Sequence, residues 1–396
     1  MEELKHDVSQ IVNDYLIGIN TRPELADVLD YTLTILKLVN EKYHYKKYIY
    51  PEIVKQLICH SNIDLFGKNY NNFVVKNRSK TVEFLQTIPQ CEQRTLEWFK
   101  MKEQTIGASE AASIFGKNAF STETELLLKK AGYKDPAKEF NPMNPYCLHG
   151  TKYEAIAQLL YSINENTEVI EFGSLPHPTI NCVSASPDGI TPTGVMLEIK
   201  VPYRRKITGI PPIYYWIQMQ QQLQVCNLDK VDFLECDIRE YLSYNDFLED
   251  QDESKDKNEP YTKEGYVKNP IIEYHKIDES DPNSTTGWIY PEKILKIDEI
   301  EQWIEDKTKE IKYSSDKMLS RVIYFKVLTY SLCEVWRDDQ WWKENSHKYQ
   351  EFWDRVEYHK MNGYDELLKT NKKYTKGPSV CIIESDEEDE TSVNSV

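Results

Sequence analysis

Two short segments near the middle of the chain decide its fold: Ser186-Pro187-Asp188-Gly189 and Leu197-Glu198-Ile199-Lys200. Asp188 follows a strand-like run, and Glu198 and Lys200 lie within a second predicted strand. Side chains two residues apart on a strand point to the same face, so Glu198 and Lys200 project together. A hairpin through the intervening Thr-Pro-Thr-Gly turn brings Asp188 beside them.

This grouping of side chains suits a metal ion. Two carboxylates and the main-chain carbonyl of Ile199 provide hard oxygen ligands for Mg²⁺ or Mn²⁺. Such an ion lowers the pKa of a bound water and stabilises charge on a phosphate, while Lys200 orients the water or stabilises the transition state. Taken singly, Pro-Asp-Gly is a common turn and Glu-x-Lys a common solvated strand face. Together, on an otherwise apolar strand over residues 195–201, they favour the catalytic interpretation.

A third carboxylate, Glu154, lies at the start of an amphipathic run. Thr151 and Glu154 have the spacing of a capping box, so one interpretation is that Glu154 only caps its own helix. The other is that Glu154, at a helix N-terminus that faces the sheet, gives a further carboxylate to the metal site. The residues alone leave both open.

A predicted helix over residues 214–223 carries polar residues on one face. Tyr215, Gln218 and Gln222 share that face by three-and-four spacing. The glutamines could hold a water or a phosphate oxygen beside the metal, or they could form a merely polar helix surface.

The segment from Trp98 to Glu110 has the features of a phosphate site. Ser109 is predicted to cap a helix that ends near Gly116, and a helix N-terminus with a hydroxyl and a nearby Lys102 suits a phosphate. On this segment alone, an ordinary N-cap explains Ser109 better.

The formal net charge of −17 does not by itself favour a nucleic-acid partner. Two segments, 246–259 and 384–390, are strongly acidic, while Lys200, Arg204 and Arg205 make the central segment locally basic. The charge balance is therefore compatible with DNA.

Other functional classes are disfavoured by composition. The eight cysteines are scattered without a C-x-x-C pair, so neither a zinc site nor an iron–sulfur cluster is expected. No apolar run is long enough for a membrane span and no secretory signal is evident, so we expect an intracellular protein in a reducing compartment.

Residue composition and hydrophobic periodicity divide the chain into five parts. We expect a helical N-terminal extension, an α/β core, an acidic loop or linker, C-terminal strands and helices, and a disordered acidic tail. Within the fourth part, strands are predicted over 271–277 and 287–294 and helix over 298–349. The five parts cover residues 1–85, 86–244, 245–270, 271–371 and 372–396.

The motifs taken in order resemble the lambda-type exonucleases, also called YqaJ-like viral recombinases. The likeness covers residues 94–236 and lies in the spacing W-x3-K-x6-S-E, G-x3-E, S-P-D-G, L-E-I-K and Y-x-x-Q-x-Q. It implies a PD-(D/E)xK nuclease core, with a mixed central sheet flanked by helices. The N-terminal extension would be helical and the C-terminal one α+β. The Asn-, Lys-, Ile- and Tyr-rich composition suits a large DNA virus with an AT-rich genome.

The resemblance also implies roles for individual residues. Asp188 and Glu198 would bind the metals, Lys200 would serve the attacking water, and Glu154 and Gln218 would line the same site. Trp98, Lys102 and Ser109 would hold a 5′-phosphate, although the phage enzymes carry Arg where Lys102 stands, and Lys offers a point charge in place of a bidentate fork. The DNA-binding set is completed by Tyr215, Gln220, Arg204 and Arg205.

The function so implied is a Mg²⁺-dependent exonuclease that resects duplex DNA ends 5′ to 3′ in recombination, replication or repair, with Mn²⁺ able to substitute. A structure-specific or nicking endonuclease with the same site is the alternative, and an inactive end-binding scaffold is disfavoured by the intact Asp188, Glu198 and Lys200. A single-strand annealing or binding protein would be a partner. The host cytoplasm, a viral replication site or the virion would be the location. Monomer, dimer and the family's ring-shaped trimer stay open.

Overall fold

The computed structural model describes residues 78–91, 95–133, 144–251, 258–277, 286–365 and 367–368. Nearly all of the expected N-terminal extension, and the acidic tail, lie outside these residues. Residues 78–87 are helical. The labelled helices that follow are α4 Leu96–Gln104, η1 Ala108–Glu110, α5 Ala111–Ile114, α6 Glu123–Lys130, α7 Pro145–Asn164, α8 Ile213–Cys226, α9 Tyr244–Glu249, α10 Ile297–Tyr313, α11 Asp339–Asn345 and α12 His347–Asn362.

The strands form two sheets. A three-stranded sheet has the order β1-β3-β2, and a six-stranded sheet has the order β4-β5-β6-β9-β7-β8. The pair β5–β6 is parallel and the other neighbours in the larger sheet are antiparallel. The predicted mixed sheet with flanking helices is therefore confirmed. The strands are β1 Ile106–Gly107, β2 Leu175–Pro176, β3 Val183–Ala185, β4 Gly189–Ile190, β5 Met196–Lys200, β6 Lys230–Glu240, β7 Lys268–Lys276, β8 Thr286–Ile289 and β9 Lys317–Trp336.

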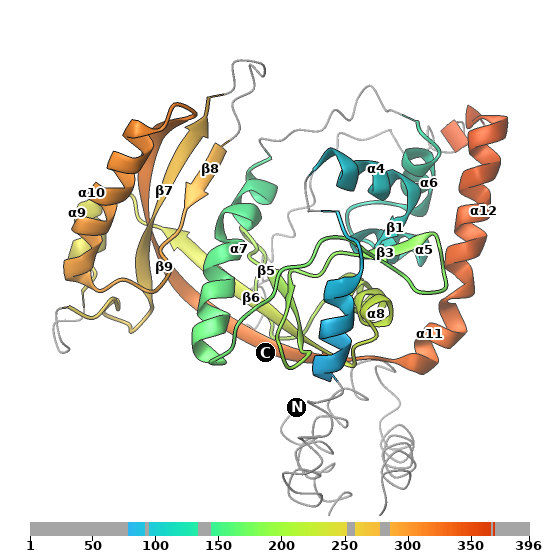
Figure 1. Cartoon of the computed structure of the whole chain (residues 1–396), viewed down its shortest axis with the longest axis horizontal. Coiled ribbons are helices and arrows are strands. Elements are labelled where there is room, and N and C mark those ends of the chain that lie inside the picture. Colours follow the sequence, from blue (N-terminus) through green and yellow to red (C-terminus); the bar gives the residue numbers. More distant parts are fainter. Residues whose placement is uncertain are drawn as a thin grey trace, which may run out of the picture.

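The long strand β9 replaces a predicted helix. We expected helix throughout residues 298–349, but only α10, α11 and the start of α12 are helical there. In β9, every second residue from Ile323 to Val327 is buried, which is the alternation of a strand. Its partners are β6 over one half and β7 over the other, so β9 crosses the molecule and joins both parts of the sheet (Figure 1).

The acidic stretch over residues 245–270 is also more ordered than expected. It contains most of α9, and β7 begins at Lys268. The side chain of Phe247 is fully buried and packs against Tyr324, with ring centroids 5.0 Å apart, so this segment does have an apolar anchor. Buried Lys268 donates hydrogen bonds to the carbonyls of Phe247, at 2.5 Å, and Asp250, at 2.7 Å.

Two hydrophobic clusters lie on opposite faces of β5. Leu197 and Ile199 belong to the cluster that includes Tyr153 and Ile156 of α7. Met196 belongs to the cluster that includes residues of α8, β3 and α12. The alternation of β5 therefore directs Glu198 and Lys200, like Met196, toward the α8 face.

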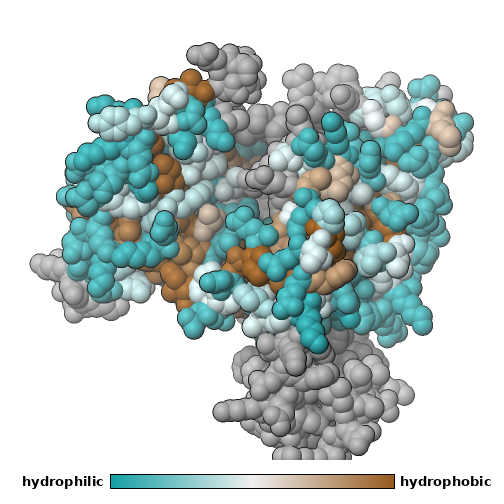
Figure 2. Space-filling view, viewed as in Figure 1, coloured by the Kyte–Doolittle hydropathy of each residue, from teal (hydrophilic) through white to brown (hydrophobic). Residues whose placement is uncertain are grey.

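The surface agrees with a sheet buried between helices. Hydrophilic residues cover the outer parts of the face shown in Figure 2, and hydrophobic residues gather mainly toward its middle. Within the described residues, every helix is too short or too polar to cross a membrane.

Candidate active site

The β4–β5 hairpin places Asp188 beside Glu198 and Lys200. Gly189 pairs with Leu197 across the hairpin, so Asp188, one residue earlier, comes level with the middle of β5. One carboxylate oxygen of Asp188 accepts a hydrogen bond from the main-chain N–H of Ile199, at 2.7 Å. The three side chains thus come together as the sequence predicts.

Glu198 is fully buried and accepts three hydrogen bonds. Its Oε1 atom receives the Lys200 ammonium and, at 2.6 Å, the amide of Gln218. Its Oε2 atom receives the amide of Gln222, also at 2.6 Å. Because charged and neutral donors fix both oxygens, this carboxylate has little freedom to rotate.

The electrostatics of the pair suit a cation. Burial raises the pKa of Asp188 well above its usual range, and the neighbouring Glu198 carboxylate raises it further. Burial opposes the charge of Lys200, but Glu198 and Asp188 raise its pKa above its ordinary value. Two ionised carboxylates beside one ammonium would leave an excess of negative charge, which a divalent ion would neutralise.

The two carboxylates fit a metal only as part of a ligand set. Among the described residues, no three His, Cys, Asp or Glu side chains come together as a ready-made metal site. Main-chain carbonyls and water must therefore complete the coordination, as hard divalent ions commonly allow.

Glu154 lies in the middle of a helix and does not cap one. Helix α7 begins at Pro145, and the Asn144 side chain caps it by accepting from the N–H of Tyr146. The capping-box interpretation of Thr151 and Glu154 is therefore wrong, and so is the placement of Glu154 at a helix N-terminus. Glu154 is half-buried, and its charge contributes to the raised pKa of Asp188, so it lies near the carboxylate pair.

The glutamines of helix α8 lie on different faces of the helix and have different partners. Gln218 and Gln222, one turn apart, both reach Glu198. Gln220 points elsewhere: its amide donates to the carbonyl of Trp336 at 2.8 Å and accepts from the N–H of Asp338 at 2.6 Å. The predicted DNA contact by buried Gln220 is therefore wrong, and Gln222 belongs to the site. The four-residue spacing from Gln218 is the signal that identifies it.

Two cations lie close to the ring of Tyr215. The Lys200 ammonium is 5.0 Å from the centre of its ring and the Arg205 guanidinium is 5.7 Å away. Arg205 also forms an ion pair with buried Glu235, so its charge is already partly compensated. Arg204 is exposed, with its guanidinium 5.5 Å from the ring of Tyr203.

The tryptophan-led segment lies against the same site. The indole N–H of Trp98 donates to the hydroxyl of Ser186 at 3.4 Å, which connects α4 to the segment preceding Asp188. Ser109 is exposed, but it lies inside η1, whose N-cap is Gly107. The predicted N-cap role of Ser109 is therefore wrong, because the chain enters a 3₁₀ turn two residues earlier.

Lys102 is a poorly solvated cation. Its ammonium lies 4.0 Å from the centre of the Trp98 ring, and burial lowers the pKa of Lys102, against an opposing effect of Glu110. Within the described ranges, no carboxylate forms an ion pair with it. A partly buried cation without a carboxylate partner is suited to an incoming anion.

Comparison with known proteins adds a family assignment. Residues 97–229 match the YqaJ-like viral recombinase domain. The match covers 133 of the 396 residues and makes this part of the chain similar to that family. All of the predicted site residues lie within this domain, and the resemblance noted in the sequence is confirmed.

The chain is also similar to a viral protein over most of its length. The uncharacterized protein R354 of Acanthamoeba polyphaga mimivirus is 29% identical over 389 residues, which cover 90% of this chain and 66% of that protein. The chain thus spans about two thirds of the length of this relative, whose source agrees with the expected viral origin.

Two solved structures resemble the chain more distantly. An alkaline exonuclease from Laribacter hongkongensis is 20% identical, with a TM-score of 0.38, over 71% of this chain and 100% of that one. A phage related exonuclease from Haemophilus somnus is 12% identical, with a TM-score of 0.34, over 67% and 96%. With TM-scores under 0.5 these likenesses are partial, and the fold described above rests on the chain's own strands and helices.

Proposed function

We propose that this chain is a Mg²⁺-dependent deoxyribonuclease that resects the ends of duplex DNA from 5′ to 3′ in viral recombination, replication or repair. The observation that carries the proposal is the grouping of Asp188 and Lys200 around the buried Glu198 within a YqaJ-like domain. Paired carboxylates with an adjacent ammonium suit metal-assisted hydrolysis of a phosphodiester.

Asp188, Glu198 and the carbonyl of Ile199 would hold the ion, with Glu154 nearby. When bound, Mg²⁺ or Mn²⁺ would lower the pKa of a water and offset charge on the phosphate. The chain's own groups prepare the site. Gln218 donates to the carboxylate of Glu198 and holds its orientation, and Lys200 provides a positive charge for the attacking water or the developing phosphate charge.

Selectivity for DNA ends would come from Trp98, Lys102 and Ser109, which we propose to form the phosphate pocket. Lys102 is a poorly solvated cation beside Trp98. Its side chain lies against Gly107. Ser109, two residues after Gly107, is exposed and offers a hydroxyl. A 5′-phosphate bound there would seat the next phosphodiester over the carboxylates. Such alignment contributes large rate factors. The exposed Arg204 would contact the DNA backbone.

The test uses purified full-length protein with Mg²⁺ on four duplexes: linear with a 5′-phosphate, linear with a 5′-hydroxyl, nicked, and closed circular. We expect the 5′-phosphorylated linear duplex to be degraded fastest and the closed circle to be spared. Lys102→Ala should erase the preference for a 5′-phosphate and leave slow cutting, whereas Lys102→Arg should retain it, since a guanidinium can bind a phosphate through two hydrogen bonds.

Two outcomes would contradict the proposal and favour another function. Cleavage of closed circles at the rate of linear duplex would make the chain a nicking or structure-specific endonuclease. Tight binding of ends without any cleavage would make it an end-binding scaffold. The release of single strands, if observed, would suit a single-strand annealing or binding protein as the next partner.

A further inference from the structure

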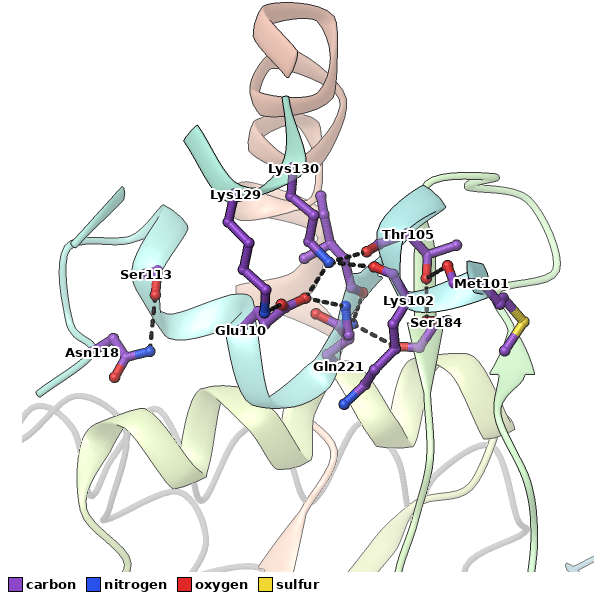
Figure 3. A network of polar contacts seen from close by, with 12 residues as sticks. Met101, Lys102, Thr105, Glu110, Ser113, Asn118, Lys129, Lys130, Ser184 and Gln221 are labelled. Atoms are coloured by element: carbon purple, nitrogen blue, oxygen red, sulfur yellow. Dashed lines mark hydrogen bonds and ion pairs between the residues drawn. The ribbon is translucent and has the colours of Figure 1, made fainter. Parts of the chain in front are cut away.

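A second charged network lies beside the phosphate pocket and uses a lysine that has no role in the proposed chemistry. The ammonium of Lys130, at the end of α6, donates to the carbonyl of Lys102 at 2.5 Å and to the carbonyl of Thr105 at 2.6 Å. It also forms an ion pair with Glu110 at 2.6 Å. The Lys130 side chain is 2% exposed, so all three of its donors are used inside the protein (Figure 3).

The carbonyl of Lys102 is among the last of helix α4, and Thr105 is the extended residue that directly follows the helix. The final carbonyls of a helix lack partners within the helix and carry partial negative charge, so an ammonium there stabilises the helix end. Burial lowers the pKa of Lys130, but Glu110 opposes that effect, which is consistent with a charge kept in place by its partners. Lys130 therefore anchors the end of α4.

The same network reaches the other side of the pocket. Glu110 ends η1, the turn that contains Ser109, and its carboxylate accepts from the N–H of Gly107 at 3.1 Å. The hydroxyls of Thr105 and Ser184 lie 2.7 Å apart, which connects the network to β3 and so to the segment that leads to Asp188. One buried ammonium thus fixes the end of α4 relative to η1.

We propose that Lys130 is a positioning residue for the terminal-phosphate pocket. By holding the end of α4 against Glu110, it sets the place from which the Lys102 side chain extends, relative to Ser109 on η1. The inference rests on the proposed function, because it assumes that Lys102 and Ser109 receive a 5′-phosphate. Lys130 itself would not touch the phosphate, since its three donors are occupied.

Lys129 provides a matched control. It is the adjacent residue of α6 and its ammonium pairs with the same carboxylate, Glu110, at 2.8 Å. Its side chain is 70% exposed and donates to no α4 carbonyl among the described contacts. Removing Lys129 therefore weakens the charge pairing of Glu110 and leaves the end of α4 anchored.

The experiment measures the ratio of cleavage rates on 5′-phosphorylated and 5′-hydroxyl linear duplexes for full-length wild type, Lys130→Met and Lys129→Met. We expect Lys130→Met to lower this ratio by about 10- to 100-fold, as for a binding group displaced by about 1 Å, with the effect mainly in KM. Lys129→Met should keep it within about threefold. Lys130→Arg should restore part of it, because a guanidinium can still donate to carbonyls.

A binding measurement separates positioning from general damage. In an Asp188→Asn background, Lys130→Met should bind 5′-phosphorylated hairpin duplex more weakly by the same factor and bind 5′-hydroxyl hairpin as before. If Lys130→Met does not fold, Glu110→Gln, which weakens the same anchor, should show the loss. A wild type without any 5′-phosphate preference would overturn the proposed function. A wild-type preference that Lys102→Ala abolishes but Lys130→Met and Glu110→Gln retain would overturn this inference alone.

Discussion

Asp188 and Glu198 carry the same charge but contribute differently to stability. Burial, and next the neighbouring Glu198 carboxylate, raise the pKa of Asp188, so its ionised form costs the fold free energy. Glu198 instead receives an ammonium and two amides, and its loss leaves those donors without their acceptor. The two residues can therefore be distinguished by stability even though both should be essential for cleavage.

For these residues we expect Asp188→Asn and Glu198→Ala each to reduce cleavage at least about a thousandfold. Without metal, Asp188→Asn should unfold at the wild-type temperature or above it, because a repulsive buried charge is removed. Glu198→Ala should lose about 2 kcal/mol, since Lys200 loses its ion pair in a mostly buried site. Thermal unfolding followed by circular dichroism measures the first, and urea unfolding measures the second. Equal stabilities for the two variants would contradict the asymmetry.

His149 of α7 is a buried histidine held neutral. It packs against Tyr153 and Tyr203, with ring centroids 4.9 and 5.1 Å away, and its Nε2 atom is buried without a hydrogen-bond partner among the described residues. Burial, and next the charge of Lys152, lower the pKa of His149 from 6.5 to about 4, against an opposing effect of Glu240.

The expected consequence is a loss of stability in acid. The unfolded chain binds a proton near pH 6.5 and the folded one only near pH 4, so the free energy of unfolding should fall by about 3 kcal/mol as the pH drops across that window. His149→Phe should flatten this part of the curve. Chemical unfolding at pH 7, 5.5 and 4.5 measures it, and identical slopes in wild type and variant would exclude His149 as the cause.

At the scale of residues, the sequence predicted the carboxylates and lysine of the site correctly, but it was less successful for the residues around them. Local spacing on one hairpin was enough to group Asp188, Glu198 and Lys200. Gln220 was misplaced because its true partners, Trp336 and Asp338, lie more than 100 residues away in sequence and were invisible to local spacing. Ser109 was misplaced because a 3₁₀ turn, common at helix N-termini, precedes α5 and moves the N-cap to Gly107.

At the scale of elements, β9 holds the sheet together. At Phe325, strand β9 pairs with both of its neighbouring strands. Glu240 of β6 lies opposite on one side and Asn269 of β7 on the other. The Phe325 side chain is fully buried and its ring lies 5.6 Å from that of Tyr153 on α7. This one position therefore connects three elements.

Phe325→Ala should lower the free energy of unfolding by about 4 kcal/mol, the range typical of a phenylalanine removed from a core. Met318→Ala on the same strand is the control, because Met318 is 55% exposed and should change stability by less than about 0.5 kcal/mol. Denaturant titration compares them. A loss below about 1 kcal/mol for Phe325→Ala would contradict a central position for β9.

The element-level predictions succeeded where the pattern was local. The strand expected over 195–201 appears as β5, and the helix expected over 214–223 appears within α8. β9 was missed because the tryptophans and charges on either side of it belong to helices α10 and α11, and the alternation inside it is clear for only a few residues. Pairing with β6 and β7, rather than local preference, selects the strand.

At the scale of the whole molecule, the net negative charge should weaken DNA binding. Removing residues 384–396 deletes six acidic residues and brings the formal net charge from −17 to −11. We expect the shortened chain to bind duplex DNA severalfold more tightly at low salt, because less negative charge repels the phosphates. Fluorescence anisotropy in an Asp188→Asn background measures this. The difference should vanish near 0.5 M salt, where screening acts within roughly 4 Å. Weaker binding by the shortened chain would show that the tail assists DNA binding.

The late position of β9 in the chain also governs when the protein can fold. Strand β6 ends at Glu240 and its partner β9 begins only at Lys317, so that edge of β6 has no partner until the ribosome has made most of the chain. Pairing across such a separation carries a loop-closure cost and slows folding. Until β9 emerges, the nascent chain exposes an unpaired strand beside the carboxylates. Such edges promote aggregation and invite chaperones. A nuclease arranged in this way would acquire its activity only after synthesis of the sheet is complete.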